Sequence, residues 1–170
     1  MSDDDQDAKH WAAVEEATEV LLDGEPQEAL VLLRQVLEAD PKNAYAYHYA
    51  GAAMFELKKY EPARDAYEAA LKLAPKYLAA RVGLSHSLRL SGDPSRAYME
   101  AVQVLEDFED DPDALYAGGL ALAALGQRAK ARKWLQRFLS SGPQLEAQLE
   151  ARGILEMLAE GDEGDPFRTG

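Results

Sequence analysis

The sequence lacks the residues and segments on which several classes of protein depend. It contains no cysteine, which excludes disulfide bonds and thiolate chemistry, and it has only three histidines. Its longest uncharged apolar stretch, residues 114–127, is about 14 residues long, whereas roughly 20 are needed to cross a bilayer. Its first residues are acidic and polar, unlike a secretory signal. These absences predict a cytoplasmic protein with no membrane insertion, no metal ion and no other cofactor.

Positive charge is also scarce, because 18 Lys and Arg stand against 31 Asp and Glu, for a net charge of −13. Such a chain repels nucleic acid and anionic membranes, so neither is expected as a partner. The charge is uneven, with twelve acids and three bases in residues 1–43 but one acid and five bases in residues 112–143. These five bases are Arg128, Lys130, Arg132, Lys133 and Arg137.

Two interpretations of this basic segment stay open. It is either a solvated convex face or a patch for an acidic partner. In the second case the acidic first unit of another copy could bind the basic fourth unit, and the protein would be a homo-oligomer.

What the sequence does contain is an internal period of 34 residues, marked by Ala29, Ala63, Ala97 and Ala131. Glycines recur five residues before three of these alanines, and prolines recur twelve residues after three of them. The residues concerned are Gly24, Gly92 and Gly126, and Pro41, Pro75 and Pro143. A period this strict is typical of an array of stacked repeats.

Each unit has the apolar spacing of two amphipathic helices joined by a tight turn. In the second unit, one set of apolar residues at helical spacing precedes the turn at residues 57–59. A second set, which contains Ala63 and Tyr67, follows this turn. Lys58 stands there in place of the usual glycine, which predicts a different turn. Pro26 and Pro94 are expected to open second helices. Small residues are expected where helices cross closely, at Ala17, Gly51, Ser85 and Gly119.

These residues resemble the tetratricopeptide repeat over residues 10–143, most closely in the second unit through Tyr47, Gly51, Ala63, Tyr67, Ala70 and Pro75. The resemblance implies an all-α fold, a right-handed superhelical α-solenoid of four helix-turn-helix repeats with a capping helix. The boundaries expected are repeats at 10–43, 44–77, 78–111 and 112–143, and a capping helix at 144–160. Residues 1–9 and 161–170 are expected to be acidic, disordered tails.

The resemblance also implies that first helices line a concave groove. The residues expected to point into it are Trp11, Val14, Tyr45, His48, Phe55, Val82, His86, Arg89 and Tyr116. The hypothesis is a non-catalytic adaptor or scaffold that holds a peptide or helix of a protein partner on these rings. The alternative for the rings is that they fill gaps between neighbouring first helices. The alternatives for the function are a dedicated chaperone for a secreted or assembling partner, a self-associating scaffold subunit, and an enzyme regulator acting through the convex face.

Two more specific sites are not expected. Family members that hold the acidic C-termini of heat-shock chaperones use lysines and asparagines where this chain has Val14, Thr18, Tyr49, Ala79 and Gly83. The acidic residues 107–113 lack the glycine and glutamate that a calcium loop requires. An aspartate there, at position 111 or 113, is expected instead to cap the following helix.

Overall fold

The computed structural model describes residues 2–163, and in that range the chain forms ten α-helices and no β-strand. The helices are α1 (Asp3–Ala12), α2 (Glu15–Leu22), α3 (Pro26–Ala39), α4 (Ala44–Glu56), α5 (Tyr60–Leu73), α6 (Leu78–Leu90), α7 (Pro94–Asp107), α8 (Pro112–Ala124), α9 (Arg128–Ser140) and α10 (Leu145–Glu163).

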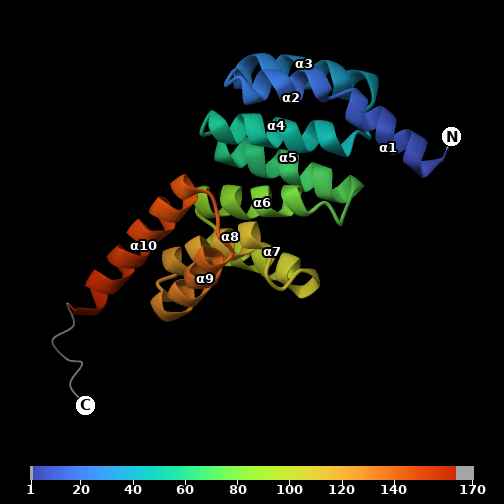
Figure 1. Cartoon of the computed structure of the whole chain (residues 1–170). Helices are drawn as coiled ribbons and strands as arrows, with labels where there is room; N and C mark the ends of the chain where they lie inside the picture. Colours follow the sequence, from blue (N-terminus) through green and yellow to red (C-terminus); the bar gives the residue numbers. More distant parts are fainter. Residues whose placement is uncertain (1, 164–170) are drawn as a thin grey trace.

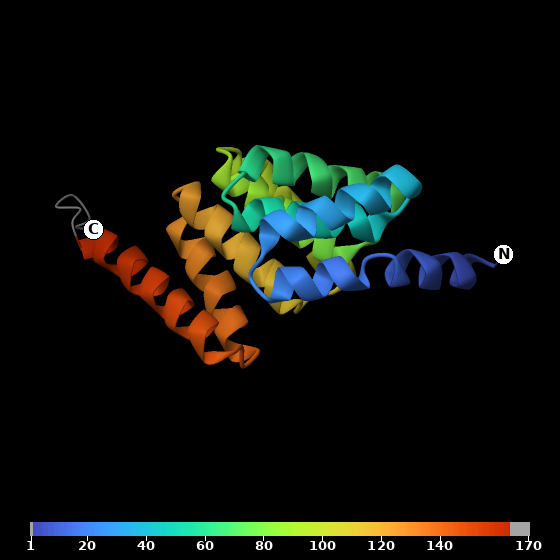
Figure 2. The ribbon, with the colours of Figure 1, turned by 90° about the horizontal axis from the view of Figure 1, so that it is seen from above.

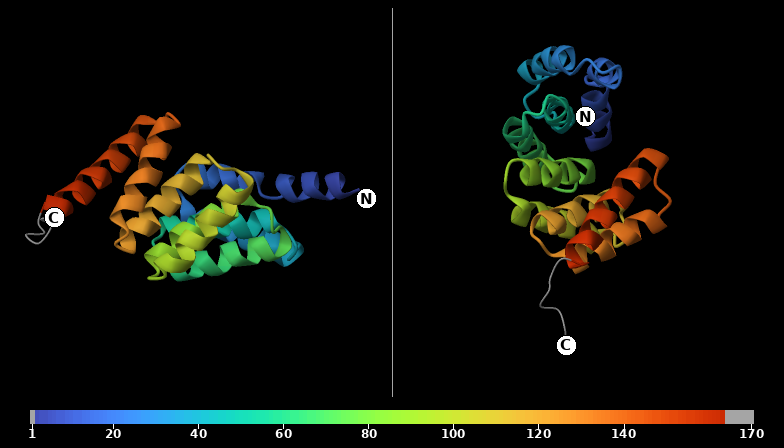
Figure 3. Two further views of the ribbon diagram at one scale, coloured as in Figure 1. Left: turned by 90° about the horizontal axis from the view of Figure 1, so that it is seen from below. Right: turned by 90° about the vertical axis from the view of Figure 1, so that its left-hand side faces the viewer.

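The helices from α2 to α9 form antiparallel pairs that stack along one direction (Figure 1). Each helix from α2 to α10 packs chiefly on its neighbours along the chain, as expected of an all-α solenoid, whereas α1 packs on α4. Seen from above, α1 extends from one end of the stack and α10 crosses the other end (Figure 2). Two further views show that the two terminal helices are separated by the body of the stack (Figure 3).

The N-terminal residues differ from expectation, because residues 3–9, which were expected to lie in a disordered tail, form helix α1 together with residues 10–12. A capping box starts this helix: the Asp5 N–H donates to Ser2 Oγ at 3.2 Å, and the Ser2 N–H donates to Asp5 Oδ2 at 3.1 Å. The first helix expected for repeat 1 is therefore split into α1 and α2, which meet at Ala13 and Val14.

At the other end, α10 extends three residues beyond the boundary expected for the capping helix. Residues 164–170 of the expected tail lie outside the described residues. The helix buries Ala151 and Leu158 against α8 and α9. Leu145 and Leu149 are 70% and 61% exposed, because they lie on a different side of the helix from Ala151.

Glycines allow an aromatic ring to bridge two repeats. Tyr67 of α5 lies between Gly51 of α4 and Gly83 of α6. A Cβ atom added at Gly51 would lie 2.9 Å from the Tyr67 ring, and one at Gly83 would lie closer still. In repeat 4 the glycine pair Gly118 and Gly119 accommodates side chains of α9 in the same way. The expectation that small residues mark close crossings is therefore confirmed.

Prolines and acidic or amide caps begin several helices as expected. Pro26 and Pro94 occupy the first positions of α3 and α7. Asp111 caps α8, since its Oδ1 accepts a hydrogen bond from the Ala114 N–H at 2.8 Å. The fully buried Asn43 caps α4 in the same way, with a distance of 3.1 Å to the Ala46 nitrogen.

The turn at Lys58 corrects the expectation that it would differ from the others. Lys58 has φ 59°, in the left-handed region occupied by Gly24, Gly92 and Gly126 at 82°, 95° and 72°. Its hydrogen bonds also match, because Lys59 donates to the Met54 carbonyl at 2.8 Å as Asp93 donates to that of Leu88. Stacking imposes one turn geometry on every repeat, and the lysine adopts it at a cost.

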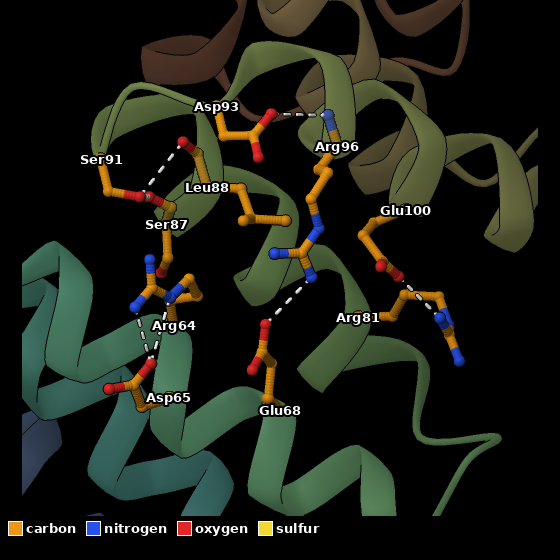
Figure 4. A network of polar contacts seen from close by, with 10 residues as sticks. All are labelled: Arg64, Asp65, Glu68, Arg81, Ser87, Leu88, Ser91, Asp93, Arg96 and Glu100. Carbon is orange, nitrogen blue, oxygen red and sulfur yellow. Dashed lines mark hydrogen bonds and ion pairs between the residues drawn. The ribbon is translucent and has the colours of Figure 1, made fainter.

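Ion pairs join helices across the outside of the stack (Figure 4). Arg96 of α7 pairs with Glu68 of α5 at 3.0 Å, and Arg81 of α6 pairs with Glu100 of α7 at 2.6 Å. The Arg96–Glu68 pair is largely exposed, and such pairs contribute about 0.2–1 kcal/mol each, while the Arg81–Glu100 pair is partly buried. Burial of small and aromatic side chains remains the main source of stability.

Replacing Lys58 by glycine is expected to stabilise the protein by about 1 kcal/mol, because glycine adopts a positive φ without the steric cost that lysine incurs. The measurement is urea unfolding followed by circular dichroism. Gly92→Lys is the matched control and should destabilise by a similar amount, since a Cβ there meets nothing within 4 Å. Equal stability of all three proteins would contradict this account of the turns.

Replacing Gly83 by alanine is expected to destabilise the protein by ~1–3 kcal/mol, because the added methyl group collides with the Tyr67 ring. Gly153→Ala is the control, since its Cβ would meet nothing within 4 Å, and helix propensity alone should stabilise it by up to about 1 kcal/mol. Thermal melts of the two variants should shift in opposite directions. A Gly83→Ala protein as stable as the parent would show that the Tyr67 ring does not require a glycine at position 83.

Candidate functional site

Aromatic side chains on and beside the first helices of the repeats form two groups of contacting rings, which we call together the aromatic row. At the N-terminal end, Trp11 of α1 meets Tyr45 of α4 edge-on, with ring centroids 5.5 Å apart. Tyr45 meets Tyr77 in the same way at 5.5 Å, and the Tyr77 centroid lies 4.7 Å from that of His48. Edge-on contacts of this kind are favourable for ring quadrupoles, and they fix the rings relative to one another.

The second group of rings lies towards the C-terminal repeats. The Phe55 and His86 centroids are 6.3 Å apart, and those of His86 and Tyr116 are 6.0 Å apart. Tyr116 then lies 4.9 Å from Phe138 of α9. The structure thus brings most of the predicted rings together, but they contact one another and are half-buried. Trp11 is the most open of them, with 41% of its surface exposed.

One predicted residue does not line the row. Val14 is completely buried and belongs to the core of repeat 1, together with Ala17 and Leu33. The break between α1 and α2 changes the direction of the helix just before Val14, so the position no longer faces outwards. Val82 is half-buried on α6.

Arg89 is the one predicted cation of the row. Its Nε is buried and has no hydrogen-bond partner within the described part of the chain. Burial lowers its pKa, and the nearby Tyr116, Glu150 and Tyr60 act in the opposite direction. Burial also raises the pKa of Tyr116, and Glu150 of α10 raises it further. Arg89 therefore places a poorly solvated positive charge among rings.

Both histidines of the row are uncharged at neutral pH. Burial lowers the pKa of His48 to about 4. Burial and the positive charge of Arg89 lower the pKa of His86 to about 4. An uncharged histidine adds an aromatic surface to the row without adding charge, and this suits contact with apolar groups better than catalysis.

Three residues at the N-terminal end of the row were not predicted to be part of it. Tyr77 continues the row, Asp7 accepts a hydrogen bond from the Tyr45 hydroxyl at 2.9 Å, and Asn43 donates to the His10 carbonyl at 2.8 Å. The last two depend on α1, of which residues 3–9 were expected to be part of a disordered tail. Tyr77 could have been found, because it follows Pro75 where Asn43 follows Pro41 in the preceding unit.

A cavity of about 700 Å³ opens beside this end of the row. It lies between α1, the start of α4 and the connection from α5 to α6. Its lining comprises Gln6, Asp7, His10, Lys42, Ala44, Tyr45, Leu73, Ala74, Pro75, Lys76 and Tyr77. Its volume falls in the range of about 300–1,000 Å³ that is typical of binding sites.

The basic segment of α9 is a surface distinct from the row. Arg128, Lys130 and Lys133 are exposed. Arg137 pairs with Asp110 at 2.6 Å and donates to the Glu109 carbonyl at 2.8 Å, while Arg132 is partly buried. Part of this charge is thus used within the fold. The binding of an acidic end of another copy there stays a prediction.

Within residues 2–163, no group of three or more histidine, aspartate or glutamate side chains could hold a metal ion. None of the described helices combines the length and the apolar character needed to span a bilayer.

Comparison with known proteins identifies the family. The tetratricopeptide repeat model matches residues 20–80, and a second model with the same description matches residues 82–146. The chain belongs to the tetratricopeptide repeat family. No curated protein sequence matches it.

Solved structures similar to this tetratricopeptide repeat protein share its fold at low identity. MamA from Desulfovibrio magneticus RS-1 is 21% identical, with 89% of this chain and 90% of that chain covered and a TM-score of 0.71. YrrB, described as a tetratricopeptide repeat protein with an unusual peptide-binding site, is 22% identical, with 91% and 78% covered and a TM-score of 0.69. A thermophilic tetratricopeptide repeat protein from Thermus thermophilus is 21% identical, with 89% and 82% covered and a TM-score of 0.72.

The family sets the general role. Tetratricopeptide repeat proteins bind protein partners and act as interaction scaffolds, and they are typically non-catalytic.

Acid is expected to destabilise the protein through His48 and His86. Their pKa values are about 4 in the folded chain, whereas an ordinary histidine has a pKa of 6.5. The unfolded chain therefore binds more protons than the folded chain between pH 4 and pH 6.5. The stability they contribute is complete above pH 6.5 and is lost as the pH falls towards 4. Between pH 7 and pH 5 the free energy of unfolding should fall by about 1–2 kcal/mol per histidine.

The measurement is urea unfolding at pH 7 and pH 5. A His48→Gln, His86→Gln double variant should lose most of this difference, because neither position then titrates. His10→Gln is the control and should retain the difference. A double variant with the same pH dependence as the parent would refute the assignment.

Proposed function

We propose that the chain holds a segment of a protein partner along the aromatic row, as an adaptor or scaffold. The observation that carries the proposal is the recurrence of contacting rings in successive repeats, from Trp11 to Tyr116, on side chains that remain partly exposed. Covering such rings removes apolar surface from water, which is worth ~25 cal/mol per Å² before ordering costs.

The row is preorganised for this role. Each ring of the row contacts another ring, edge-on or tilted, so little side-chain freedom remains to be lost on binding. Packing between rings and binding of a partner are therefore compatible uses of the same side chains. The relative YrrB, whose description names a peptide-binding site, supports a peptide as the form of the bound segment.

A pull-down with quantitative mass spectrometry tests the proposal. The test variant combines Trp11→Ala with Ala79→Glu. Ala79 is exposed and occupies in repeat 3 the position of Tyr45 in repeat 2, so a glutamate there adds charge to the surface without removing a packed side chain. Capture of partners should fall at least tenfold, because the surface loses a ring and gains a carboxylate.

The control is Met99→Glu, on the second helix α7, where the side chain is 64% exposed. It should retain full capture, and both variants should melt within a few degrees of the parent. Undiminished capture by the row variant would contradict the proposal, as would equal loss in the Met99→Glu control.

A further inference from the structure

The cavity at the N-terminal end of the row combines an aromatic floor with a basic rim. Tyr45 and Tyr77 form the floor, and Leu73, which is 42% exposed, adds an apolar wall. Lys42 and Lys76 are both exposed at its edge. Each lysine directly follows the proline that ends a repeat, so the 34-residue period places both on the same side of the stack.

The acids near the cavity are already engaged. Asp7 accepts the Tyr45 hydroxyl, and Asp40 accepts the Lys42 backbone N–H at 3.0 Å and contacts the His10 Nε2 at 2.9 Å. Within residues 2–163 neither Lys42 nor Lys76 has a carboxylate within 4.0 Å. The two ammonium groups are thus positive charges available to a ligand in a strongly acidic protein.

Helix α1 shows which groups this surface accepts. It places Asp7 and Trp11, one helical turn apart, on Tyr45: the carboxylate receives the hydroxyl proton and the indole contacts the ring edge-on. An acidic group and an aromatic group one turn apart therefore already contact Tyr45, which lines the cavity. Elsewhere in the lining, Tyr77 offers a second ring to an aromatic group, and the ammonium groups of Lys42 and Lys76 offer positive charge to carboxylates.

We propose that this cavity is the specificity pocket of the aromatic row, and that it takes a partner segment in which an aromatic side chain adjoins acidic residues. The aromatic group lies against Tyr45 and Tyr77, and the carboxylates face Lys42 and Lys76. The inference rests on the proposed function and gives the bound segment a defined chemistry.

Fluorescein-labelled nine-residue peptides test this, with fluorescence anisotropy in 50 mM salt as the readout. One peptide carries Glu-Glu-Phe at its centre between serine and glycine residues. Two others replace this core by Gln-Gln-Phe and by Glu-Glu-Ala. The Glu-Glu-Phe peptide should bind at least fivefold more tightly than either, since two ion pairs or one buried ring are then lost.

Matched lysine variants locate the contact. In the Lys42→Gln, Lys76→Gln double variant the affinities for Glu-Glu-Phe and Gln-Gln-Phe should become equal. The control is Lys58→Gln with Lys130→Gln, which removes the same charge elsewhere and should keep the fivefold preference. Salt of 500 mM should reduce the preference in the parent.

Equal binding of the three peptides by the parent protein would overturn the inference, as would a preference that survives loss of Lys42 and Lys76. So would failure of every peptide to bind. None of these results would by itself refute the proposed function, because the pull-down with the row variant decides whether the row binds a partner at all.

Discussion

The fold depends on the close packing of the Tyr67 ring against two glycines that have no side chain. Tyr67 occupies the space between Gly51 in its own repeat and Gly83 in the next, so one side chain sets both the packing within a repeat and the spacing between repeats. Interiors packed this closely tolerate little added volume. This spacing in turn places rings of successive repeats with their centroids 4.7–6.3 Å apart. The aromatic row is therefore a consequence of the stacking.

Most of the architecture could be predicted from the sequence because it repeats. The period fixes the helix pairs, and the small residues, the prolines and Asp111 have local roles that their types reveal. The turn at Lys58 could not be predicted from its residue type, since the fold imposes a conformation that lysine does not favour. The exposure of Leu145 and Leu149 could not be predicted either. The terminal helix has no following repeat against which both of its apolar sides could pack.

The candidate site was only partly predictable for a related reason. Position within the repeat identifies rings that contact one another in the structure, among them Tyr45, His86 and Tyr116. It places Val14 wrongly, because the break between α1 and α2 ends the regular repeat geometry there. It also misses the cavity, since two of the walls come from α1 and from the connection before α6. Irregular segments added to a regular array thus supply the features that distinguish this member of the family.

The central claim is that a partner binds along the aromatic row and not on the second helices of the repeats, such as α7 and α9. The most direct test is to map amide chemical-shift changes in ¹⁵N-labelled protein when the Glu-Glu-Phe peptide or a captured partner is added. The account predicts the largest changes at Tyr45, Tyr77 and Ala79, with little change at Met99 of α7 or Lys130 of α9. Changes confined to α7 and α9, with the row unaffected, would contradict it.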